Sequence, residues 1–357
     1  MHFKLSLPLL ALSAQAAVLR RPETPRRFCG ARDFVQELDG RKEQQVAEAI
    51  ADGNVDELFG RAQTVLVNFH SIQGDNTTGF VTDKMIADQI QVLNDDYKSF
   101  TFKLNHTTRT IDRSIFYPGY DSRAETKMKK SLRMGDGTTL NVYTASLSGG
   151  LLGWATFPTD LESRPWRDGV VVHYATLPGG SSAPYDKGRT LTHEAGHWFG
   201  MWHTFQDGCS YPNDFVEDTI PERGPAFGCP APRKTCRMRN FPRSDQGTFN
   251  ATDASEDKMD PTRNFMDYVE DGCMDHFTKG QYTRMKAMWS TRKDFDGSFE
   301  TILEEVEEEV ADSDDDNDDD STDSDDDNDD DTDDDESSDS PEDEESTAEP
   351  KFEEIVI

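Results

Sequence analysis

The sequence predicts an α+β fold in which a sheet with a backing helix leads into a helix with a metal-ligand pattern, and an irregular, disulfide-held lower subdomain follows. Three observations carry this prediction. Runs of β-branched and aromatic residues recur between turn residues in the first half of the chain, and a helical period of apolar residues lies among them. The stretch 208–261 then becomes rich in Pro, Gly, Asp and Arg, has almost no periodic apolar pattern and contains three cysteines.

Strands are expected where β-branched runs are bounded by turn residues. Four such runs cover residues 64–70, 100–105, 140–144 and 169–175. Between the first two runs, apolar residues recur at helical spacing behind Thr82-Asp83, which predicts an amphipathic helix. Its apolar positions are Ile86, Ile90 and Leu93. A capping-box pattern, Thr278-x-x-Gln281, is expected to begin the last helix.

A glycine-rich loop over residues 177–184 leads to the helix around which the chain is organised, with Asp186 as the candidate N-cap. This helix carries the string H-E-x-x-H-x-x-G-x-x-H, whose fixed residues are His193, Glu194, His197, Gly200 and His203. Residues four apart share a helix face, so the first two histidines can offer ring nitrogens to one ion. The glycine can turn the chain back so that the third histidine joins them.

Three protein ligands leave one position for water on a tetrahedral zinc ion, which is typical of a catalytic site rather than a structural one. A lone pair of histidines at helical spacing is more often a surface or core feature. The complete string is far more restrictive, because every fixed position of a known zinc-hydrolase signature is matched. The string therefore predicts a zinc-dependent hydrolase.

Composition divides the chain into four segments. Residues 1–17 combine Lys4, an apolar run and a small-x-small cleavage pattern, which predicts a secretory signal peptide. Residues 18–61 are charged, carry basic pairs and resemble a pro-segment. Residues 62–299 are expected to form the catalytic domain. The last segment, 300–357, carries a net charge of −31 of the chain's −34 and has almost nothing apolar to bury, so we expect a disordered acidic tail.

The acidic tail has two interpretations. The simpler one is a solvating extension, and the alternative is weak capture of divalent cations or attachment to a basic partner. The tail lacks the glycine turn and the ligand spacing of an EF-hand, so no defined calcium site follows from it.

The cysteines and sequons fit an oxidising secretory route. Four of the five cysteines cluster and should form two disulfides, with three connectivities open: Cys209, Cys229, Cys236 and Cys273. Cys29 is left over, far upstream. Acceptors for N-glycosylation occur at Asn76, Asn105 and Asn250.

The string from His193 to His203, together with Asn264-Phe-Met-Asp-Tyr268, resembles the metzincin clan. Further stretches resemble its pappalysin family, particularly the secreted fungal extracellular metalloproteases. They are Val65-Leu-Val-Asn-Phe-His70, Gln89-Ile-Gln-Val-Leu-Asn94, Leu152-Gly-Trp-Ala-Thr-Phe-Pro158, Leu177-Pro-Gly-Gly180, His203-Thr-Phe-Gln-Asp-Gly-Cys209, Glu217-Asp-Thr219, Phe227-Gly-Cys-Pro230 and Cys273-Met274. The resemblance covers about residues 62–292. It implies a metzincin-type zincin with a twisted, mixed five-stranded sheet and two long helices above the cleft.

The resemblance also implies roles for single residues. Tyr268 would stabilise the oxyanion, and Met266 would lie in a Met-turn beneath the zinc. Glu194 is placed beside the ligands on the helix, where it can act as general base on the water. A purely structural hydroxyl is the alternative for Tyr268, and simple packing is the alternative for Met266. Carried over by order, the disulfides would pair Cys209 with Cys236 and Cys229 with Cys273.

Two further implications concern metal ligands. Asp214, Thr219 and the carbonyl of Val216 align with a calcium-binding stretch of bacterial relatives, with a spacing that differs by about a residue. Cys29, in Arg27-Phe-Cys-Gly30, resembles a pro-segment motif whose thiolate takes the open position on zinc and keeps the enzyme latent. A free or intermolecularly paired thiol is the alternative for this cysteine.

We therefore expect a secreted, monomeric zinc endopeptidase that binds protein or peptide substrates and neither nucleic acid nor membrane, with Ca²⁺ as a candidate second ion. His173 is expected in a strand or the cleft rather than among the ligands. An astacin-like protease is a rival that the cysteine pattern and His203-Thr-Phe205 disfavour. A catalytically silent zinc-bearing scaffold, with a tail that binds ions or partners, is the non-enzyme alternative, and the intact Glu194 disfavours it.

Overall fold

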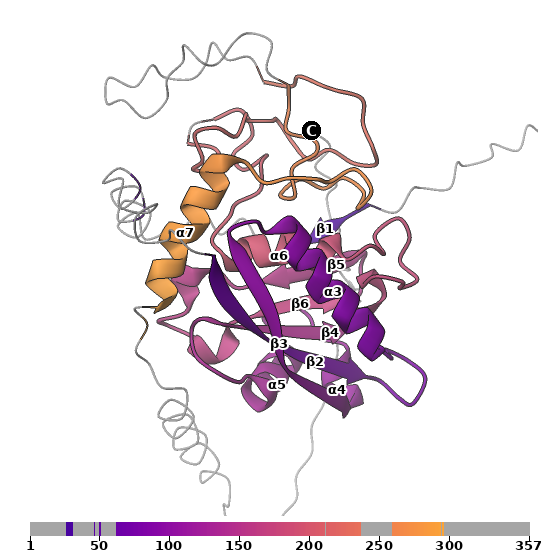
Figure 1. The fold of residues 1–357 in the computed structure, drawn as a ribbon. Coiled ribbons are helices and arrows are strands. Elements are labelled where there is room, and N and C mark those ends of the chain that lie inside the picture. The colour runs from indigo at the N-terminus through magenta and orange to yellow at the C-terminus, as the bar shows by residue number, and fades with distance from the viewer. Residues whose placement is uncertain are drawn as a thin grey trace, which may run out of the picture. The chain divides into compact units, whose positions relative to one another are not determined.

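The predicted strands form the centre of a twisted mixed sheet in the computed structural model (Figure 1). The strand order is β1-β5-β6-β4-β2-β3. The strands are β1 (Phe28–Cys29), β2 (Gln63–Gln73), β3 (Phe100–Ile111), β4 (Thr139–Ala145), β5 (Leu151–Ala155) and β6 (Val170–His173). Strands β2, β3, β4 and β6 run parallel, β5 runs antiparallel to β6, and β1 runs parallel to β5.

The sheet departs from the sequence-based expectation at its β1–β5 edge. Strands β2 to β6 make up the five expected strands, although β5 is not among the predicted runs because Gly153 interrupts its strand pattern. A sixth strand, β1, comes from the segment predicted as a pro-segment. Two residues carry no strand pattern of their own, and β1 forms because it pairs with the edge of β5.

The structure describes residues 26–30, 46, 50, 62–210, 212–236, 259–293 and 295. The predicted signal peptide, most of the predicted pro-segment, the sequon at Asn250 and the acidic tail lie outside the described residues. None of the helices within the described ranges has both the length and the apolar character that crossing a bilayer requires.

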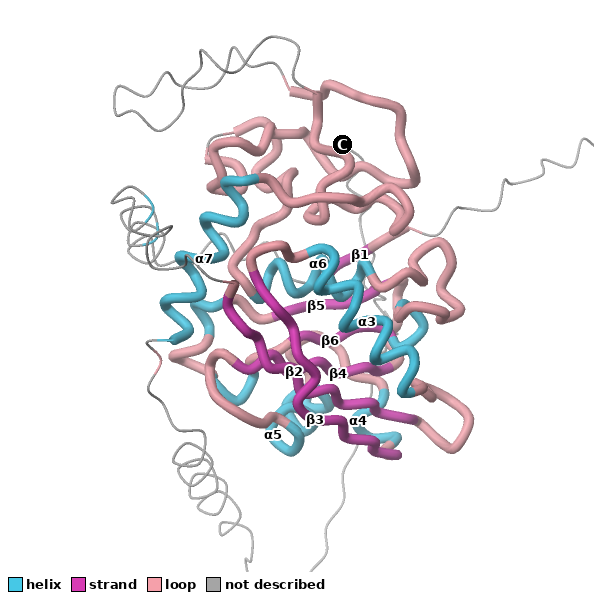
Figure 2. The backbone as a smooth tube through the Cα atoms, viewed as in Figure 1, coloured by secondary structure: helices cyan, strands magenta, loops and turns pink. Residues whose placement is uncertain are grey.

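Three helices pack into one core with one face of the sheet: α3 (Asp83–Asp96), α6 (Arg189–Trp198) and α7 (Lys279–Lys293). Helices α3 and α6 lie side by side over the strands (Figures 1 and 2). As predicted, Thr82 caps α3, and its hydroxyl accepts a hydrogen bond from the Met85 amide at 3.1 Å. The shared core includes Val67, Phe69, Leu93, Ala195 and Trp289.

Two short helices that the sequence does not predict cover the other face of the sheet: α4 (Arg113–Phe116) and α5 (Arg123–Leu132). They lie on the side of the sheet opposite to α3 and α6 (Figure 2). Their apolar side chains form a second core with the sheet, which includes Ile72, Phe116, Met128, Tyr143 and Trp154. Three single-turn 3₁₀ helices flank β6: Pro158–Asp160, Pro165–Arg167 and Tyr174–Thr176.

A buried carboxylate joins α5 to this second core. Glu125 contacts the Lys129 ammonium at 2.9 Å and the Arg167 guanidinium at 3.1 Å, and it accepts a hydrogen bond from the Trp154 indole at 2.7 Å. Burial alone would raise the pKa of Glu125. The two cations and the indole hydrogen bond outweigh burial and lower this pKa to about 2.

Helix α6 begins in a way that differs from the expectation. Its N-cap is Gly188, with a left-handed φ of 84°, and not Asp186. Gly188 has no side chain that could accept a hydrogen bond, so a carboxylate distant in sequence caps the helix instead. Asp271 Oδ2 accepts hydrogen bonds from the amides of Lys187 at 2.9 Å and Arg189 at 3.2 Å. At the other end Gly200 has a left-handed φ of 83° and turns the chain, as predicted.

Among the described residues, the segment between α6 and α7 has no helix or strand, and covalent and ionic crosslinks hold it together. The disulfides are Cys209–Cys236 and Cys229–Cys273, the pairing that the resemblance implies. Arg233 adds ion pairs with Glu222 at 2.7 Å and Asp260 at 3.0 Å. Such crosslinks supply stability that the sparse apolar residues of this part cannot.

Candidate metal centre and active site

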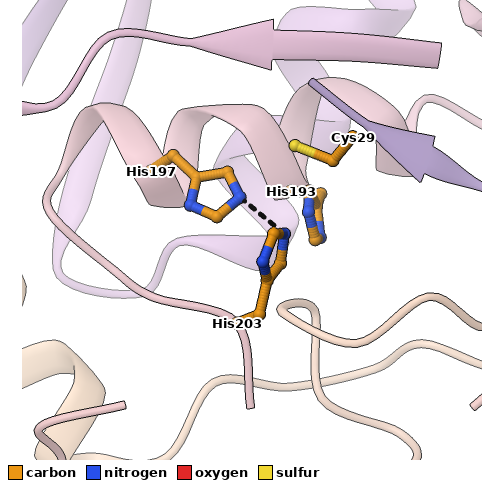
Figure 3. Close-up of side chains that lie close together, drawn as sticks. All are labelled: Cys29, His193, His197 and His203. Atoms are coloured by element: carbon orange, nitrogen blue, oxygen red, sulfur yellow. Dashed lines mark hydrogen bonds between the residues drawn. The ribbon is translucent and has the colours of Figure 1, made fainter. Parts of the chain in front are cut away.

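Helix α6 and the turn after it bring three imidazoles together. His193 and His197 lie one turn apart on α6, and the left-handed turn at Gly200 returns His203 to them (Figure 3). All three histidines are at most 2% exposed. Their ligand atoms and the sulfur of Cys29 all lie within 4.8 Å of one another. The structure thus brings the three predicted ligands together with the cysteine to which the resemblance gives a latency role.

Hydrogen bonding sets the tautomer of two of these rings. His193 Nδ1 lies 2.7 Å from the Phe265 carbonyl oxygen, and His197 Nδ1 lies 2.7 Å from the Met201 carbonyl oxygen. A carbonyl accepts only, so each Nδ1 carries the proton and each Nε2 presents a lone pair. Burial lowers the pKa of both rings well below 6.5, and the neighbouring imidazoles lower it further.

The Nε2 atoms of the rings face one another across a short gap. His193 Nε2 is buried and has no hydrogen-bond partner among the described residues, and His197 Nε2 lies 3.1 Å from His203 Nε2. Buried acceptors without donors are costly, and a cation between them removes that cost. The donor set therefore fits a metal ion.

Glu194 lies on the same helix with its carboxylate directed at the cluster. Its Oε2 is 3.2 Å from the Cys29 sulfur, which donates its S–H to it. Burial raises the pKa of Glu194 to about 8, while the Cys29 hydrogen bond and the charge of Arg27 act in the opposite direction. Gly153 of β5 makes room for this side chain, because a β-carbon there would lie 2.8 Å from Glu194 Cγ.

The turn that contains Met266 lies beneath α6. Met266 is fully buried, and a β-carbon at Gly196 of α6 would collide with its sulfur. The Met266 amide donates to Asn264 Oδ1 at 2.9 Å, and the side-chain amides of Asn264 and Gln281 exchange two hydrogen bonds of 2.8 and 3.1 Å. Gln281 is also the capping-box residue of α7, which forms as predicted with Thr278.

Tyr268 follows two residues later and faces the histidines. Its ring centroid lies 5.0 Å from that of His203 and 5.7 Å from that of His193. Its hydroxyl accepts a hydrogen bond from the Cys29 amide at 3.4 Å. The tyrosine, the cysteine and the imidazoles therefore share one site.

Strand β1 places Cys29 in that site. Gly30 donates its amide to the Gly153 carbonyl at 2.8 Å, which anchors β1 on β5. Two residues earlier, Arg27 Nη2 pairs with Asp271 Oδ1 at 2.5 Å, and this arginine is 1% exposed. The Arg27 guanidinium also lies 5.3 Å from the centroid of the Tyr185 ring. Sequence reasoning missed Asp271, because nothing near it in the chain resembles a ligand motif.

The residues aligned with a calcium-binding stretch form one buried group. Asp214 and Thr219 are each 1% exposed, and Asp214 Oδ1 accepts a hydrogen bond from the Val216 amide at 3.1 Å. Burial raises the pKa of Asp214 well above its ordinary value. The neighbouring Asn213, which sequence reasoning missed, has a buried Oδ1 with no hydrogen-bond partner among the described residues. The Val216 carbonyl accepts from the Thr219 amide at 3.3 Å.

The remaining predicted positions are not part of the metal-ligating group found among the described residues. His173 ends β6 and its Nδ1 accepts a hydrogen bond from the Ala175 amide at 3.1 Å, as a strand residue and not as a member of the metal-ligating group. Strand β1 is the edge strand of the sheet at the site, β5 lies next to it, and β6 lies one strand further in. Asn76 and Asn105 are both exposed, so both sequons are accessible.

Comparisons with known proteins identify the family to which this chain belongs. A model of the peptidase family M43, described as pregnancy-associated plasma protein-A, matches residues 140–290. Extracellular metalloprotease 1 of Coccidioides posadasii is 38% identical over 293 residues, which span 80% of this chain and 97% of that relative. An extracellular metalloprotease of Colletotrichum graminicola is 38% identical over 244 residues, which span 65% of this chain and 80% of that relative.

Solved structures of mirolysin from Tannerella forsythia share the fold. Mature mirolysin in complex with a cleaved peptide is 29% identical to this chain with a TM-score of 0.50. The match covers 65% of this chain and 96% of the mirolysin chain. A promirolysin mutant is 25% identical with a TM-score of 0.55, and this match covers 78% of this chain and 98% of the promirolysin chain. The chain therefore belongs to the pappalysin family, M43, of metzincin metallopeptidases.

Proposed function

We propose that this chain is a secreted zinc-dependent endopeptidase that hydrolyses peptide bonds of extracellular proteins. The observation that carries the proposal is the convergence of His193, His197 and His203 with the carboxylate of Glu194 beside them. Neutral imidazoles are a donor set that zinc prefers, and three of them leave a position for water. The names of the fungal relatives, extracellular metalloproteases, support secretion.

The side chains around the ion would divide the chemistry between them. A zinc ion held by the imidazoles would polarise a bound water and lower its pKa to about 7. Glu194 would accept a proton from this water and deliver it to the leaving amine. The hydroxyl of Tyr268 would donate a hydrogen bond to the oxygen that gains charge as the scissile carbonyl is attacked. Met266 would keep the floor of the site apolar and fixed.

Latency is the second part of the proposal. Cys29 lies against the imidazoles and Glu194, where its thiolate would take the position of the water. Strand β1 pairs with the outer edge of β5, and sheet edges of this kind bind extended peptides. Promirolysin covers 78% of this chain and mature mirolysin 65%, which supports a pro-segment ahead of the catalytic domain.

The buried Arg27 indicates what a substrate would place in the same pocket. Removal of the pro-segment leaves Asp271 without its guanidinium, in a pocket bordered by the Tyr185 ring. A buried carboxylate without a counter-charge is unfavourable, so the pocket would select a basic substrate side chain. Asp271→Asn keeps an acceptor for the α6 amides and removes the charge. In the processed protein we expect it to abolish a preference for Arg over norleucine near the cleaved bond.

The zinc mechanism is tested on processed protein with gelatin as substrate. Glu194→Gln should lower kcat by about 10²–10⁴-fold while bound zinc, measured by mass spectrometry, stays equal to that of the unmodified protein. Chelation should remove activity from both, and added zinc should restore only the unmodified protein. Activity that survives chelation and Glu194→Gln contradicts the mechanism. A zinc-loaded, processed protein that cleaves no denatured substrate would favour the scaffold alternative.

We also propose that the group formed by Asp214, the Val216 carbonyl and Thr219 binds calcium. Carboxylate, carbonyl and hydroxyl oxygens are the ligands this hard cation prefers. The buried Asp214 supports a cation there, and so does Asn213 Oδ1, which has no hydrogen-bond partner in the part of the chain that the structure describes.

A further inference from the structure

The residue before Arg27 has a contact of its own. The Arg26 guanidinium lies 5.3 Å from the centroid of the Phe227 ring, while Arg27 enters the Asp271 pocket. The two consecutive arginines that precede β1 therefore contact two different groups. The first is a ring face, which attracts a cation through its quadrupole, and the second is a buried carboxylate.

The Phe227 ring is held on a fixed loop. Just before it, the Ala226 amide donates to Asp267 Oδ1 at 2.8 Å, and Ala226 is fully buried. Just after it, the Gly228 carbonyl accepts from the Glu270 amide at 2.9 Å, and Cys229 is bonded to Cys273. A ring fixed on both sides loses little conformational freedom when a ligand packs on it, so the surface is preorganised.

The segment that follows Tyr268 brings a negative charge next to this loop. The Glu270 carboxylate lies beside Gly228, the residue next to Phe227. Its charge also raises the pKa of Tyr185, the ring against which Arg27 lies, after burial as the larger cause. Glu270 is therefore close to both arginine contacts, and neither the proposed zinc chemistry nor latency through Cys29 uses it.

We propose that Phe227 and Glu270 form a second substrate subsite, which binds a cationic side chain next to the one in the Asp271 pocket. The substrate class would then be peptides with paired basic residues. This inference rests on the proposed peptidase function and adds a second position of selectivity to it. An exposed cation–π contact corresponds to about a two- to five-fold effect in binding.

The test uses processed, zinc-loaded protein and quenched fluorescent peptides that keep Arg at the pocket position and carry Arg or Ala at each neighbouring position. We expect kcat/KM to be about two- to five-fold higher for Arg than for Ala at one of those neighbours. Phe227→Ala should bring this ratio close to one, and Phe227→Trp should preserve it. Phe80→Ala, which removes an exposed phenylalanine elsewhere in the chain, is the control and should leave the ratio as it is.

A binding measurement separates this inference from the peptidase proposal. A peptide of residues 26–30 and its Arg26→Ala form are titrated calorimetrically into the processed protein and into its Phe227→Ala variant. The Arg26→Ala change should weaken binding about two- to five-fold to the first and not to the second. The subsite is overturned if Arg26→Ala weakens binding equally in both proteins. It is also overturned if Phe227→Ala leaves the Arg-to-Ala ratio of kcat/KM unchanged. Absence of cleavage with this coupling present would instead overturn the peptidase function alone.

Discussion

Arg27 and Asp271 form an ion pair that is almost entirely removed from solvent, with side chains 1% and 0% exposed. Replacing Arg27 by Ala should leave the carboxylate buried and unpaired, which costs about 2–5 kcal/mol. We therefore expect the unprocessed Arg27→Ala chain to be markedly more active on a short peptide than the unprocessed parent. Arg26→Ala, which removes only an exposed contact, serves as the control with a much smaller effect.

The contact between Cys29 and Glu194 predicts a second route to activation. Cys29→Ala removes the thiol while it leaves the Arg27 pair in place, so the unprocessed chain should gain activity without cleavage of its pro-segment. Initial rates before and after processing measure this. The alternative of a free or intermolecularly paired thiol predicts unchanged latency, and for a paired thiol a disulfide-linked species on a non-reducing gel.

Gly153 predicts a defect confined to the chemical step. Its substitution by Ala would place a β-carbon 2.8 Å from Glu194 Cγ and 2.9 Å from the Val171 carbonyl oxygen, so the carboxylate must move. A misplaced base should lower kcat by at least about ten-fold in the processed protein, with zinc content unchanged. Gly224→Ala is a matched control, because a β-carbon there meets nothing within 4 Å. Equal kcat values for the two variants would contradict the role given to this close contact.

Glu125 predicts how stability depends on pH. Its pKa is about 2 in the folded chain against 4.5 as the ordinary value, so the folded state favours the charged carboxylate. This contribution, about 3 kcal/mol, is present above pH 4.5 and is lost as the pH falls through 2. Glu125→Gln cannot titrate there. The difference in unfolding free energy between parent and variant, from urea denaturation, should therefore be largest near neutral pH and shrink between pH 4.5 and 2.

The calcium proposal predicts a change in thermal stability. Micromolar to millimolar Ca²⁺ should raise the Tm of the zinc-loaded protein, because an ion that binds only the folded state stabilises it. Asp214→Asn removes a charged ligand and should abolish the Ca²⁺-dependent rise. Glu217→Gln, an exposed carboxylate in the same stretch, should retain it. A rise in Tm that persists in Asp214→Asn would place the ion elsewhere.

The parts of the site that lie close together in sequence could be predicted, and those that depend on distant pairing could not. The histidine string determines its own geometry, because helical spacing and one left-handed glycine bring the rings together. The cap of α6 could not be foreseen, since Asp271 lies 82 residues from Arg189, whose amide it binds. Strand β1 was equally hidden, because two residues join a sheet only where an existing edge is open.

The hydrogen bonds between Asn264 and Gln281 connect the first turn of α7 to the turn that supports the imidazoles. Helix α7 supplies no ligand, yet any fraying of its first turn would be transmitted to the Phe265 carbonyl and so to the orientation of His193. We therefore expect thermal inactivation to begin at α7, so that activity is lost before the sheet unfolds. Stiffening that first turn would lengthen the lifetime of the active enzyme without touching a catalytic atom.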